Sequence, residues 1–189
     1  MKLFLIRHGQ TQANLDGIYS GQSDVMLTDL GKAQAEALRP ILEKIPFDRV
    51  YSSDLTRAIH TRQLALPGTD ATTTPLLREY DLGSLTGLPI AEVRQQYGNL
   101  RSDFRPFGGE DPHMMDARTG AFLELLEADP RDYVAAFAHN GTIKSFLRLV
   151  LGEGCNTLNI VNANCNIGVL EFSGGRWKLL AWNLMEAIR

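Results

Sequence analysis

Residues 2–11, KLFLIRHGQT, begin with a run of apolar side chains that stops at Arg7 and His8. A short apolar run that ends abruptly in polar residues is typical of a buried strand that leads into a loop. Arginine and histidine side chains both bind anions, and here they lie where the expected strand ends. This stretch therefore predicts a central strand whose carboxyl end carries two anion-binding groups.

The strand-then-turn pattern returns at residues 49–66, RVYSSDLTRAIHTRQLAL. β-Branched and aromatic residues predict a strand at 49–52, and the following apolar spacing predicts a helix that ends near Leu66. Ser53 or Asp54 is expected to be the N-cap of this helix, because a short side-chain oxygen satisfies the free backbone amides there.

A third copy of the pattern lies at residues 132–152, DYVAAFAHNGTIKSFLRLVLG. YVAAFA predicts a buried strand, and the apolar period that follows predicts a helix that Gly152 ends. His139 falls between the two elements. The alternation of strands and helices favours a parallel sheet that is covered by helices on both faces.

Two more helices are expected. From Thr28, a plausible N-cap, apolar residues recur at helical spacing as far as Ile45. Pro40 lies inside this helix and should kink it, because proline lacks the amide hydrogen that the helix needs. A further helix is expected at about 112–128.

Two strands near the end of the chain, at 166–172 and 176–182, flank a Ser-Gly-Gly turn and predict a hairpin. The resulting fold class is α/β, a three-layer α/β/α sandwich with a mainly parallel sheet and one antiparallel strand. Residues 1–189 are expected to form a single domain. Residues 98–116 are rich in glycine, proline and charge, which predicts a long surface loop and a lid over the site.

Charge and composition exclude several classes of partner. The 189 residues include 19 basic and 22 acidic side chains, a net charge of −3, with no long basic run to follow a nucleic-acid backbone. No stretch has the roughly 18 consecutive apolar residues that a membrane span requires, and the amino terminus does not resemble a signal peptide. We therefore expect a cytoplasmic protein with no nucleic-acid or membrane partner. Cys155 and Cys165 are expected to be buried apolar residues, not a disulfide or a zinc site.

Arg7 with His8, Arg57 and His139 each follow an expected strand. Because ligand crevices form outside the carboxyl ends of parallel strands, these side chains are expected to converge. Two guanidinium forks and two imidazoles favour a phosphoryl group as the ligand. The chain has neither a GxxxxGK[ST] loop nor an obvious cluster of metal-binding carboxylates, so a histidine nucleophile with arginines in place of Mg²⁺ is the expected chemistry. No metal or cofactor is expected.

Six blocks of sequence together resemble the histidine phosphatase superfamily, branch 1, which is also called phosphoglycerate mutase-like. The resemblance runs from about residue 3 to residue 150. In chain order the blocks are LIRHGQTQAN (5–14), SGQSDVMLTDLGKAQAEAL (20–38), VYSSDLTRAIHT (50–61), LLREYDLGSLTG (76–87), GGED (108–111) and FAHNGTI (137–143).

The resemblance implies a catalytic role for five residues. His8 would be the nucleophile, Arg7 and Arg57 the phosphate clamps, His139 a second contact to the phosphoryl group and Glu79 the general acid.

Three further residues are expected to bind substrate: Asn14, Gln22 and Asn140. Asn14 matches the asparagine of the family's first motif. Asn140 is a departure, because the family usually has glycine directly after its second histidine.

The expected activity is that of a phosphatase. Mutases of this family carry a longer segment between the acid and the second histidine, with basic residues that hold a bisphosphorylated cofactor. Here Glu79 and His139 are 60 positions apart, and the sequence between them has arginines but no lysine and no basic cluster. We expect a metal-independent phosphomonoester phosphatase that acts on a small phosphorylated metabolite through a phosphohistidine.

Two alternatives stay open at this point: phosphoglycerate mutase-type phosphoryl transfer, and a non-catalytic protein that binds phosphorylated ligands. Residues 162–172, NANCNIGVLEF, resemble the α-ribazole phosphatase group. Within the 98–116 loop, the side chains expected to meet the leaving group are Phe104, Arg105, Phe107 and His113. The sequence predicts neither the substrate nor the oligomeric state.

Overall fold

A six-stranded sheet lies at the centre of the computed structural model, which describes residues 1–152 and 160–184. Its strand order is β3-β2-β4-β1-β5-β6. Only β5 runs against the other five strands, because it pairs antiparallel with both β1 and β6 while the remaining pairs are parallel. The mainly parallel sheet with one antiparallel strand is therefore confirmed. The strands are β1 (Lys2–Arg7), β2 (Arg49–Ser53), β3 (Thr72–Thr74), β4 (Tyr133–Ala138), β5 (Ile167–Ser173) and β6 (Arg176–Ala181).

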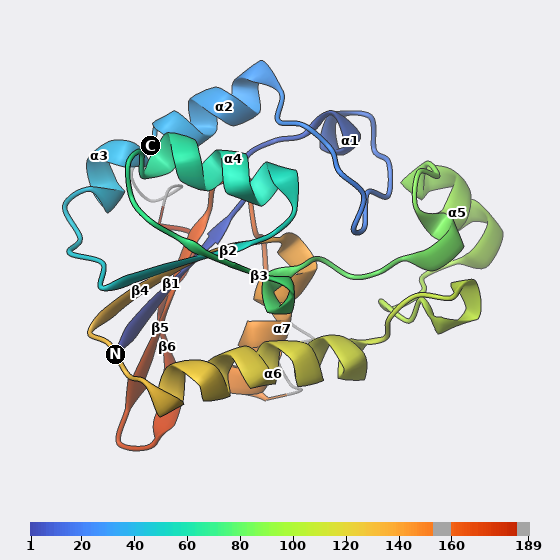
Figure 1. The fold of residues 1–189 in the computed structure, drawn as a ribbon. Helices are drawn as coiled ribbons and strands as arrows, with labels where there is room; N and C mark the ends of the chain where they lie inside the picture. Colours follow the sequence, from blue (N-terminus) through green and yellow to red (C-terminus); the bar gives the residue numbers. More distant parts are fainter. Residues whose placement is uncertain (153–159, 185–189) are drawn as a thin grey trace.

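Helices cover both faces of this sheet, as Figure 1 shows. Leu3 and Leu5 of β1 lie in a core shared with α6 and α7, whereas Phe4 and Ile6 lie in a second core shared with α2, α3 and α4. Because successive side chains of a strand point to opposite faces, one apolar strand supplies both cores. The three-layer sandwich is confirmed. The helices of the two layers are α2 (Asp29–Glu36), α3 (Arg39–Leu42) and α4 (Thr56–Ala65) on one face, and α6 (Pro112–Ala128) and α7 (Asn140–Leu151) on the other.

The helix expected from Thr28 to Ile45 is in fact two helices. Thr28 caps α2 as predicted, since its hydroxyl accepts from the Gly31 amide at 3.0 Å. The chain leaves α2 after Glu36 and resumes as α3, with Pro40 in its first turn. A proline ring collides with the carbonyl four residues before it, which here belongs to Glu36, so the break replaces the expected kink.

The expected N-cap of α4 is wrong. Leu55, not Ser53 or Asp54, occupies that position. The Ser53 hydroxyl accepts from the Leu55 amide, and Asp54 pairs with an arginine elsewhere. Instead, a carboxylate from a distant loop, Asp24, accepts from both the amide and the hydroxyl of Thr56.

The remaining predicted elements are confirmed. Helix α6 begins after Asp111, whose carboxylate accepts from the Met114 amide, and α7 ends at Gly152, which has a φ of 79°. Strands β5 and β6 form the expected hairpin. Cys165 is buried and free, whereas Cys155 lies outside the described residues.

Several short elements were not expected from the sequence. They are the edge strand β3 (Thr72–Thr74), the helices α1 (Gln12–Leu15) and α5 (Ile90–Tyr97), and three single 3₁₀ turns, η1 (Pro75–Leu77), η2 (Gly83–Leu85) and η3 (Arg105–Phe107). The 98–116 segment contains η3 and the start of α6, so it is less irregular than predicted. In the part of the chain that the structure describes, every helix is too short or too polar to span a lipid bilayer.

Helix α2 and the loop after β1 touch through their backbones. A Cβ on Gly31 would overlap the carbonyl oxygen of Gln10, and a Cβ on Gly9 would overlap the carbonyl oxygen of Gly31. Only glycine permits this approach, because every other residue brings at least a methyl group. The loop that carries His8 is therefore seated against α2 by two glycines.

This contact predicts opposite outcomes for one substitution at two helical positions. Gly31→Ala should lower the free energy of unfolding by about 1–3 kcal/mol through overpacking. Gly120→Ala in α6 should raise it by up to about 1 kcal/mol, because a Cβ there meets only a leucine methyl at 3.9 Å and alanine favours helix. Thermal unfolding measures both, at about 2–4 °C per kcal/mol for a chain of this size. Equal shifts would contradict the contact.

Candidate active site

The three strand-to-helix junctions converge at one edge of the sheet. Strands β2, β4 and β1 are parallel neighbours, so their carboxyl ends lie together. The rings of His8 and His139 have centroids 5.2 Å apart. The Nε of Arg57 donates to Nδ1 of His139 at 3.1 Å. This convergence was predicted from the sequence and is confirmed.

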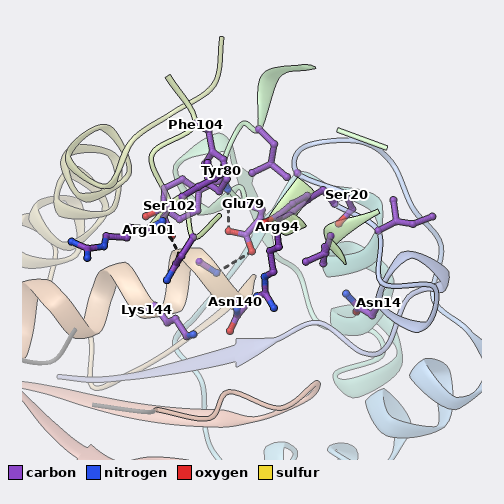
Figure 2. Close-up of a pocket in the computed structure, with 18 of the residues that line it drawn as sticks. Asn14, Ser20, Glu79, Tyr80, Arg94, Arg101, Ser102, Phe104, Asn140 and Lys144 are labelled. Atoms are coloured by element: carbon purple, nitrogen blue, oxygen red, sulfur yellow. Dashed lines mark hydrogen bonds between the residues drawn. The ribbon is translucent and has the colours of Figure 1, made fainter. Parts of the chain in front are cut away.

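A cavity of about 380 Å³ opens above this edge. Glu79, Asn14 and Asn140 are among its labelled lining residues in Figure 2. Of the eight site residues expected from the sequence, six line it: Arg7, His8, Asn14, Arg57, Glu79 and Asn140. His139 is fully buried behind the wall, and Gln22 lies outside the lining.

His8 is held as a neutral imidazole with a defined tautomer. Its Nδ1 lies 2.7 Å from the Gly9 carbonyl oxygen, which only accepts, so Nδ1 carries the hydrogen and Nε2 keeps its lone pair. Burial lowers the pKa of His8 well below its usual value, and the positive charges of Arg57 and Arg7 lower it further. The free lone pair on Nε2 is the form that a nucleophile requires.

His139 has the opposite tautomer. Its Nδ1 accepts from the Arg57 guanidinium, so the hydrogen lies on Nε2. That Nε2 is buried and has no hydrogen-bond partner within the described residues. Burial, followed by the charges of Arg57, His8 and Arg7, lowers the pKa of His139 well below its usual value. The imidazole thus offers one buried N–H donor that awaits an acceptor.

Arg57, which is buried, and Arg7, which is partly buried, bring two positive charges to the cavity. Arg57 is 1% exposed and donates to the carbonyl oxygens of Gly21 and Ser23, at 2.7 and 2.9 Å. Burial lowers its pKa to about 10, although the charge of Glu79 acts in the other direction. Arg7 donates to the Asn162 carbonyl, and its Nε has no partner within the described residues. Unpaired buried donors cost about 1–3 kcal/mol each, which an oxyanion would offset.

Glu79 is fixed from two backbone segments. Its Oε1 accepts from the Tyr80 amide at 3.0 Å, and its Oε2 accepts from the Gly141 amide at 2.9 Å. A Cβ on Gly141 would overlap the carboxylate. Gly141, which lies one position later than the glycine of the family pattern, therefore makes the contact with Glu79. Asn140, directly before it, lines the cavity.

The three expected substrate-binding side chains lie in different surroundings. The Asn14 side chain accepts from the Thr11 amide, where it closes the capping box of α1. The Asn140 side-chain oxygen accepts from Asn162 at 3.3 Å. Gln22 bridges the Glu79 carbonyl and Arg78 instead of facing the cavity.

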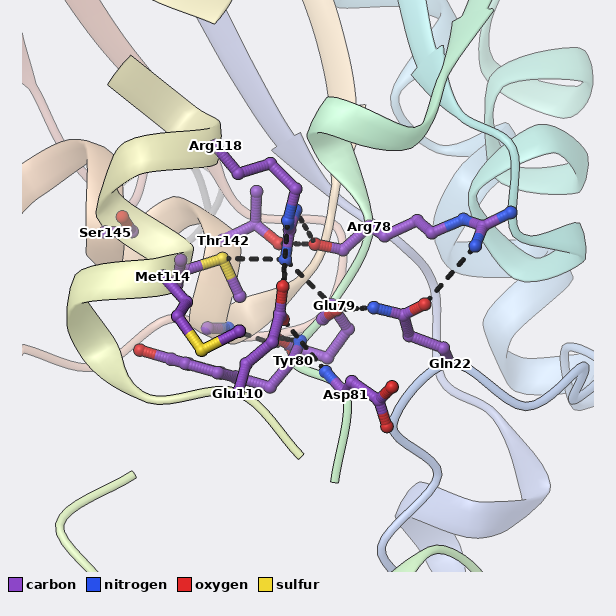
Figure 3. A network of polar contacts seen from close by, with 12 residues as sticks. Gln22, Arg78, Glu79, Tyr80, Asp81, Glu110, Met114, Arg118, Thr142 and Ser145 are labelled. Carbon is purple, nitrogen blue, oxygen red and sulfur yellow. Dashed lines mark hydrogen bonds and ion pairs between the residues drawn. The ribbon is translucent and has the colours of Figure 1, made fainter. Parts of the chain in front are cut away.

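A polar network behind Glu79 was not expected from the sequence (Figure 3). Arg118 donates to the carbonyl oxygens of Arg78 and Glu79 and pairs with Glu110 at 2.9 Å. Glu110 in turn accepts from the Asp81 amide. Glu110 belongs to the GGED block, and Arg118 is one of the arginines between Glu79 and His139. Nothing in the sequence indicates that these two side chains pair. The network holds the backbone on either side of Glu79.

The 98–116 segment contributes to the cavity differently than expected. Phe104 lines it, as predicted, and so do Leu100, Arg101 and Ser102. The other three predicted contacts are not in the lining. Arg105 pairs with Asp103 and Asp111, Phe107 packs on Tyr97, and His113 is exposed on α6.

The fold also gathers basic residues that the sequence did not show as a cluster. Arg94 and Arg101 line the cavity together with Lys144, which follows His139 in the chain. The sequence between Glu79 and His139 has no basic cluster, but the fold gathers cations from separate segments at the cavity. Among the described residues, no three His, Cys, Asp or Glu side chains are grouped so as to hold a metal ion.

Comparison with known proteins relates this geometry to a family. The profile of the histidine phosphatase superfamily (branch 1) matches residues 3–185. An adenosylcobalamin/alpha-ribazole phosphatase of Escherichia coli is 32% identical over 162 residues, which cover 80% of each chain. The solved structure of a mycobacterial glucosyl-3-phosphoglycerate phosphatase superposes with a TM-score of 0.86 and 29% identity, and the match covers 96% of this chain and 98% of that one.

Other relatives match over shorter lengths or have another activity in their name. The adenosylcobalamin/alpha-ribazole phosphatase of Salmonella typhimurium is 50% identical, but only over 70 residues, so the match spans 37% of this chain and 35% of that protein. A 2,3-bisphosphoglycerate-dependent phosphoglycerate mutase of Gloeobacter violaceus is 33% identical over 160 residues, which cover 77% of this chain and 73% of the mutase.

The lowered pKa values of His8 and His139 predict how the free energy of unfolding depends on pH in the absence of ligand. Because both folded-state pKa values lie below the unfolded value near 6.5, the unfolded chain takes up these protons first as the pH falls. The free energy of unfolding should therefore decrease from pH 7.5 to 5.5, by at most about 1.4 kcal/mol per pH unit for each histidine. Urea unfolding at several pH values measures the slope.

The double variant His8→Asn/His139→Asn should be clearly less sensitive to pH over this range. His113→Asn is the control, because His113 is exposed. An unchanged slope in the double variant would contradict the assignment.

Proposed function

The chain belongs to branch 1 of the histidine phosphatase superfamily, and we propose that it is a metal-independent phosphomonoester phosphatase. The observation that carries the proposal is the joint geometry of His8 and His139. One imidazole keeps a lone pair on Nε2, the other keeps an unpartnered N–H, and two buried guanidinium groups lie beside them. This set matches a phosphoryl group, which needs a nucleophile for phosphorus and donors for its oxygens.

In the first step, Nε2 of His8 attacks phosphorus while the bond to the ester oxygen breaks. The phosphoryl oxygens accept hydrogen bonds from Arg7, Arg57 and Nε2–H of His139, which balance the charge that a metal ion supplies in other phosphoryl-transfer enzymes. Glu79, as the carboxylic acid, gives its proton to the departing oxygen. Each of its oxygens accepts one backbone amide and keeps a second lone pair for that proton.

In the second step, water attacks the phosphohistidine. The Glu79 carboxylate takes one proton from the water, inorganic phosphate leaves, and His8 regains its lone pair. The reaction therefore returns the site to its starting state without a cofactor. The alternation of Glu79 between acid and base requires a fixed position, which the Gly141 amide and the Arg118 network support.

Water is the acceptor in this proposal, and a second phosphorylated acid is the alternative. The spacing of 60 positions between Glu79 and His139 and the two phosphatase relatives favour water. The basic side chains at the cavity and the Gloeobacter mutase favour the alternative. Conversion of 3-phosphoglycerate in the presence of 2,3-bisphosphoglycerate separates the two, because isomerisation faster than phosphate release would identify a mutase.

The wider expectations belong to the same proposal. We treat residues 1–189 as one catalytic domain that acts on a small phosphorylated metabolite. The 98–116 segment would serve as a lid, which the position of Leu100 and Phe104 in the cavity wall supports. A cytoplasmic location stays a prediction.

The nucleophile can be tested with p-nitrophenyl phosphate. The wild-type protein should release phosphate in the presence and absence of EDTA, and His8→Ala should reduce the rate by about a thousandfold or more. Rapid acid-free denaturation during turnover of ³²P-labelled ester should trap an acid-labile adduct. His60→Ala, which changes a half-buried histidine outside the cavity lining, is the matched control. If no ester is hydrolysed, the chain is instead a non-catalytic binding protein.

The acid can be tested by varying the leaving group. Glu79→Gln should slow an alkyl phosphate by on the order of 100-fold, since the alkoxide cannot leave without a proton. With p-nitrophenyl phosphate, the same variant should still give a rapid burst of p-nitrophenolate, followed by slow hydrolysis of the phosphohistidine. Stopped-flow absorbance measures the burst. Glu92→Gln, on the exposed side of α5, is the control. If the variant slows formation of the phosphohistidine equally with both esters, so that no burst is seen with p-nitrophenyl phosphate, Glu79 is not the acid.

A further inference from the structure

The charges around the cavity exceed what a phosphoryl group requires. A phosphomonoester carries up to two negative charges, and Arg7 and Arg57 at the floor supply two positive ones. The cavity is nevertheless lined by only one carboxylate, Glu79, and by six cationic side chains. The cations are Arg7, Arg57, Arg94, Arg101, Lys144 and Arg148.

Arg148 does not add to this excess. Its Nε donates to Asp116 at 3.1 Å, and a second nitrogen lies 3.3 Å from the Tyr80 hydroxyl. Asp116 also accepts from Ser145, so its carboxylate is fully engaged in this partly buried network. The charge of Arg148 is therefore balanced inside the protein.

Arg94, Arg101 and Lys144 are different. None of them has an ion-pair partner among the residues that the structure describes, and all three are exposed to solvent in the cavity wall. Most other arginines of the described chain are paired with a carboxylate, for example Arg78 with Asp54. Exposed cations without an ion pair also occur elsewhere in the described chain, for example Lys44 and Arg176, but Arg94, Arg101 and Lys144 differ from these because all three line one cavity.

The three side chains come from separate elements that the fold brings together. Arg94 lies in the last turn of α5, Arg101 in the turn that follows it, and Lys144 in the second turn of α7 (Figure 2). The amide of Arg101 donates to the Asn99 side chain at 3.1 Å, and Arg101 has a φ of 49°. Unpaired cations that line one cavity raise the local concentration of anions there.

We propose that Arg94, Arg101 and Lys144 form a second anion subsite, and that the substrate is a phosphomonoester with a further anionic group. This inference rests on the proposed phosphatase function, because it takes the phosphoryl group to lie at His8. The further group is a carboxylate or a second phosphate, both of which an arginine fork binds through paired oxygens. A cavity of about 380 Å³ suits a small metabolite of this class.

Two matched substrate pairs test the subsite. 3-Phosphoglycerate and glycerol 3-phosphate differ by a carboxylate in place of a hydroxymethyl group. Fructose 1,6-bisphosphate and fructose 6-phosphate differ by the second phosphate. In at least one pair, kcat/KM for phosphate release should be about tenfold or more higher for the more anionic member. The preference should shrink as the salt concentration rises, because the three side chains are exposed.

The triple variant R94Q/R101Q/K144Q should bring that ratio close to one. K44Q and R176Q are the charge-matched controls, because Lys44 and Arg176 are exposed cations without an ion pair in the described chain and are not in the cavity lining. They should leave the ratio as in the wild type. A wild-type ratio near one in both pairs, or a ratio that survives the triple substitution, would overturn the subsite and leave the phosphatase proposal intact.

If no ester is hydrolysed, the phosphatase proposal fails and binding decides the subsite. Calorimetry then compares 3-phosphoglycerate with glycerol 3-phosphate, and the two fructose phosphates with each other, on the wild-type protein. Tighter binding of the more anionic member, lost in the triple variant, supports the subsite. Equal binding within both pairs overturns it.

Discussion

The hydrogen bond from Arg57 to His139 is the interaction on which the rest of the site depends. It joins the first turn of α4 to the end of β4 at 3.1 Å, with both side chains buried. Because a guanidinium only donates, the bond decides the tautomer of His139 and directs its remaining N–H away from Arg57. The same guanidinium holds the loop at Gly21 and Ser23 through their carbonyl oxygens. One side chain thus positions a donor and a loop, and contributes its own charge to the cavity.

Without a ligand, such a site lowers the stability of the folded protein. Two guanidinium groups and two imidazoles lie together at the cavity, and the carboxylate that lines it, Glu79, makes its hydrogen bonds to backbone amides. Burial and mutual repulsion lower the pKa of both histidines, so the free protein keeps them neutral to limit the charge. An incoming oxyanion reverses this balance, since it supplies the acceptors and the negative charge that the site lacks. The groups that reduce the stability of the free protein are therefore the groups that bind the anion.

The sequence predicted the parts of the fold and site that depend on local order. Apolar runs such as YVAAFA end in a polar residue, and parallel pairing then brings these ends together, so His8 and His139 could be placed at one edge. What it missed depends on contacts between distant segments. The sequence does not predict the N-cap of α4 correctly, because the Thr56 amide in the first turn donates to Asp24, which lies 32 positions earlier in the chain. Arg94 and Lys144 both line the cavity only because the fold positions α5 and α7 there. Their spacing in the sequence does not predict it.

The two glycines of the motifs show how local sequence and distant contact combine. Gly9 follows His8 and touches α2, whereas Gly141 follows the second histidine by two positions and touches Glu79. In each case a backbone approaches a neighbour more closely than any side chain would allow. His8 and Glu79 are thus located by steric fit at glycine, in addition to hydrogen bonds. Position 140 carries a side chain for the same reason: the close contact with the carboxylate belongs to Gly141, so Asn140 can line the cavity.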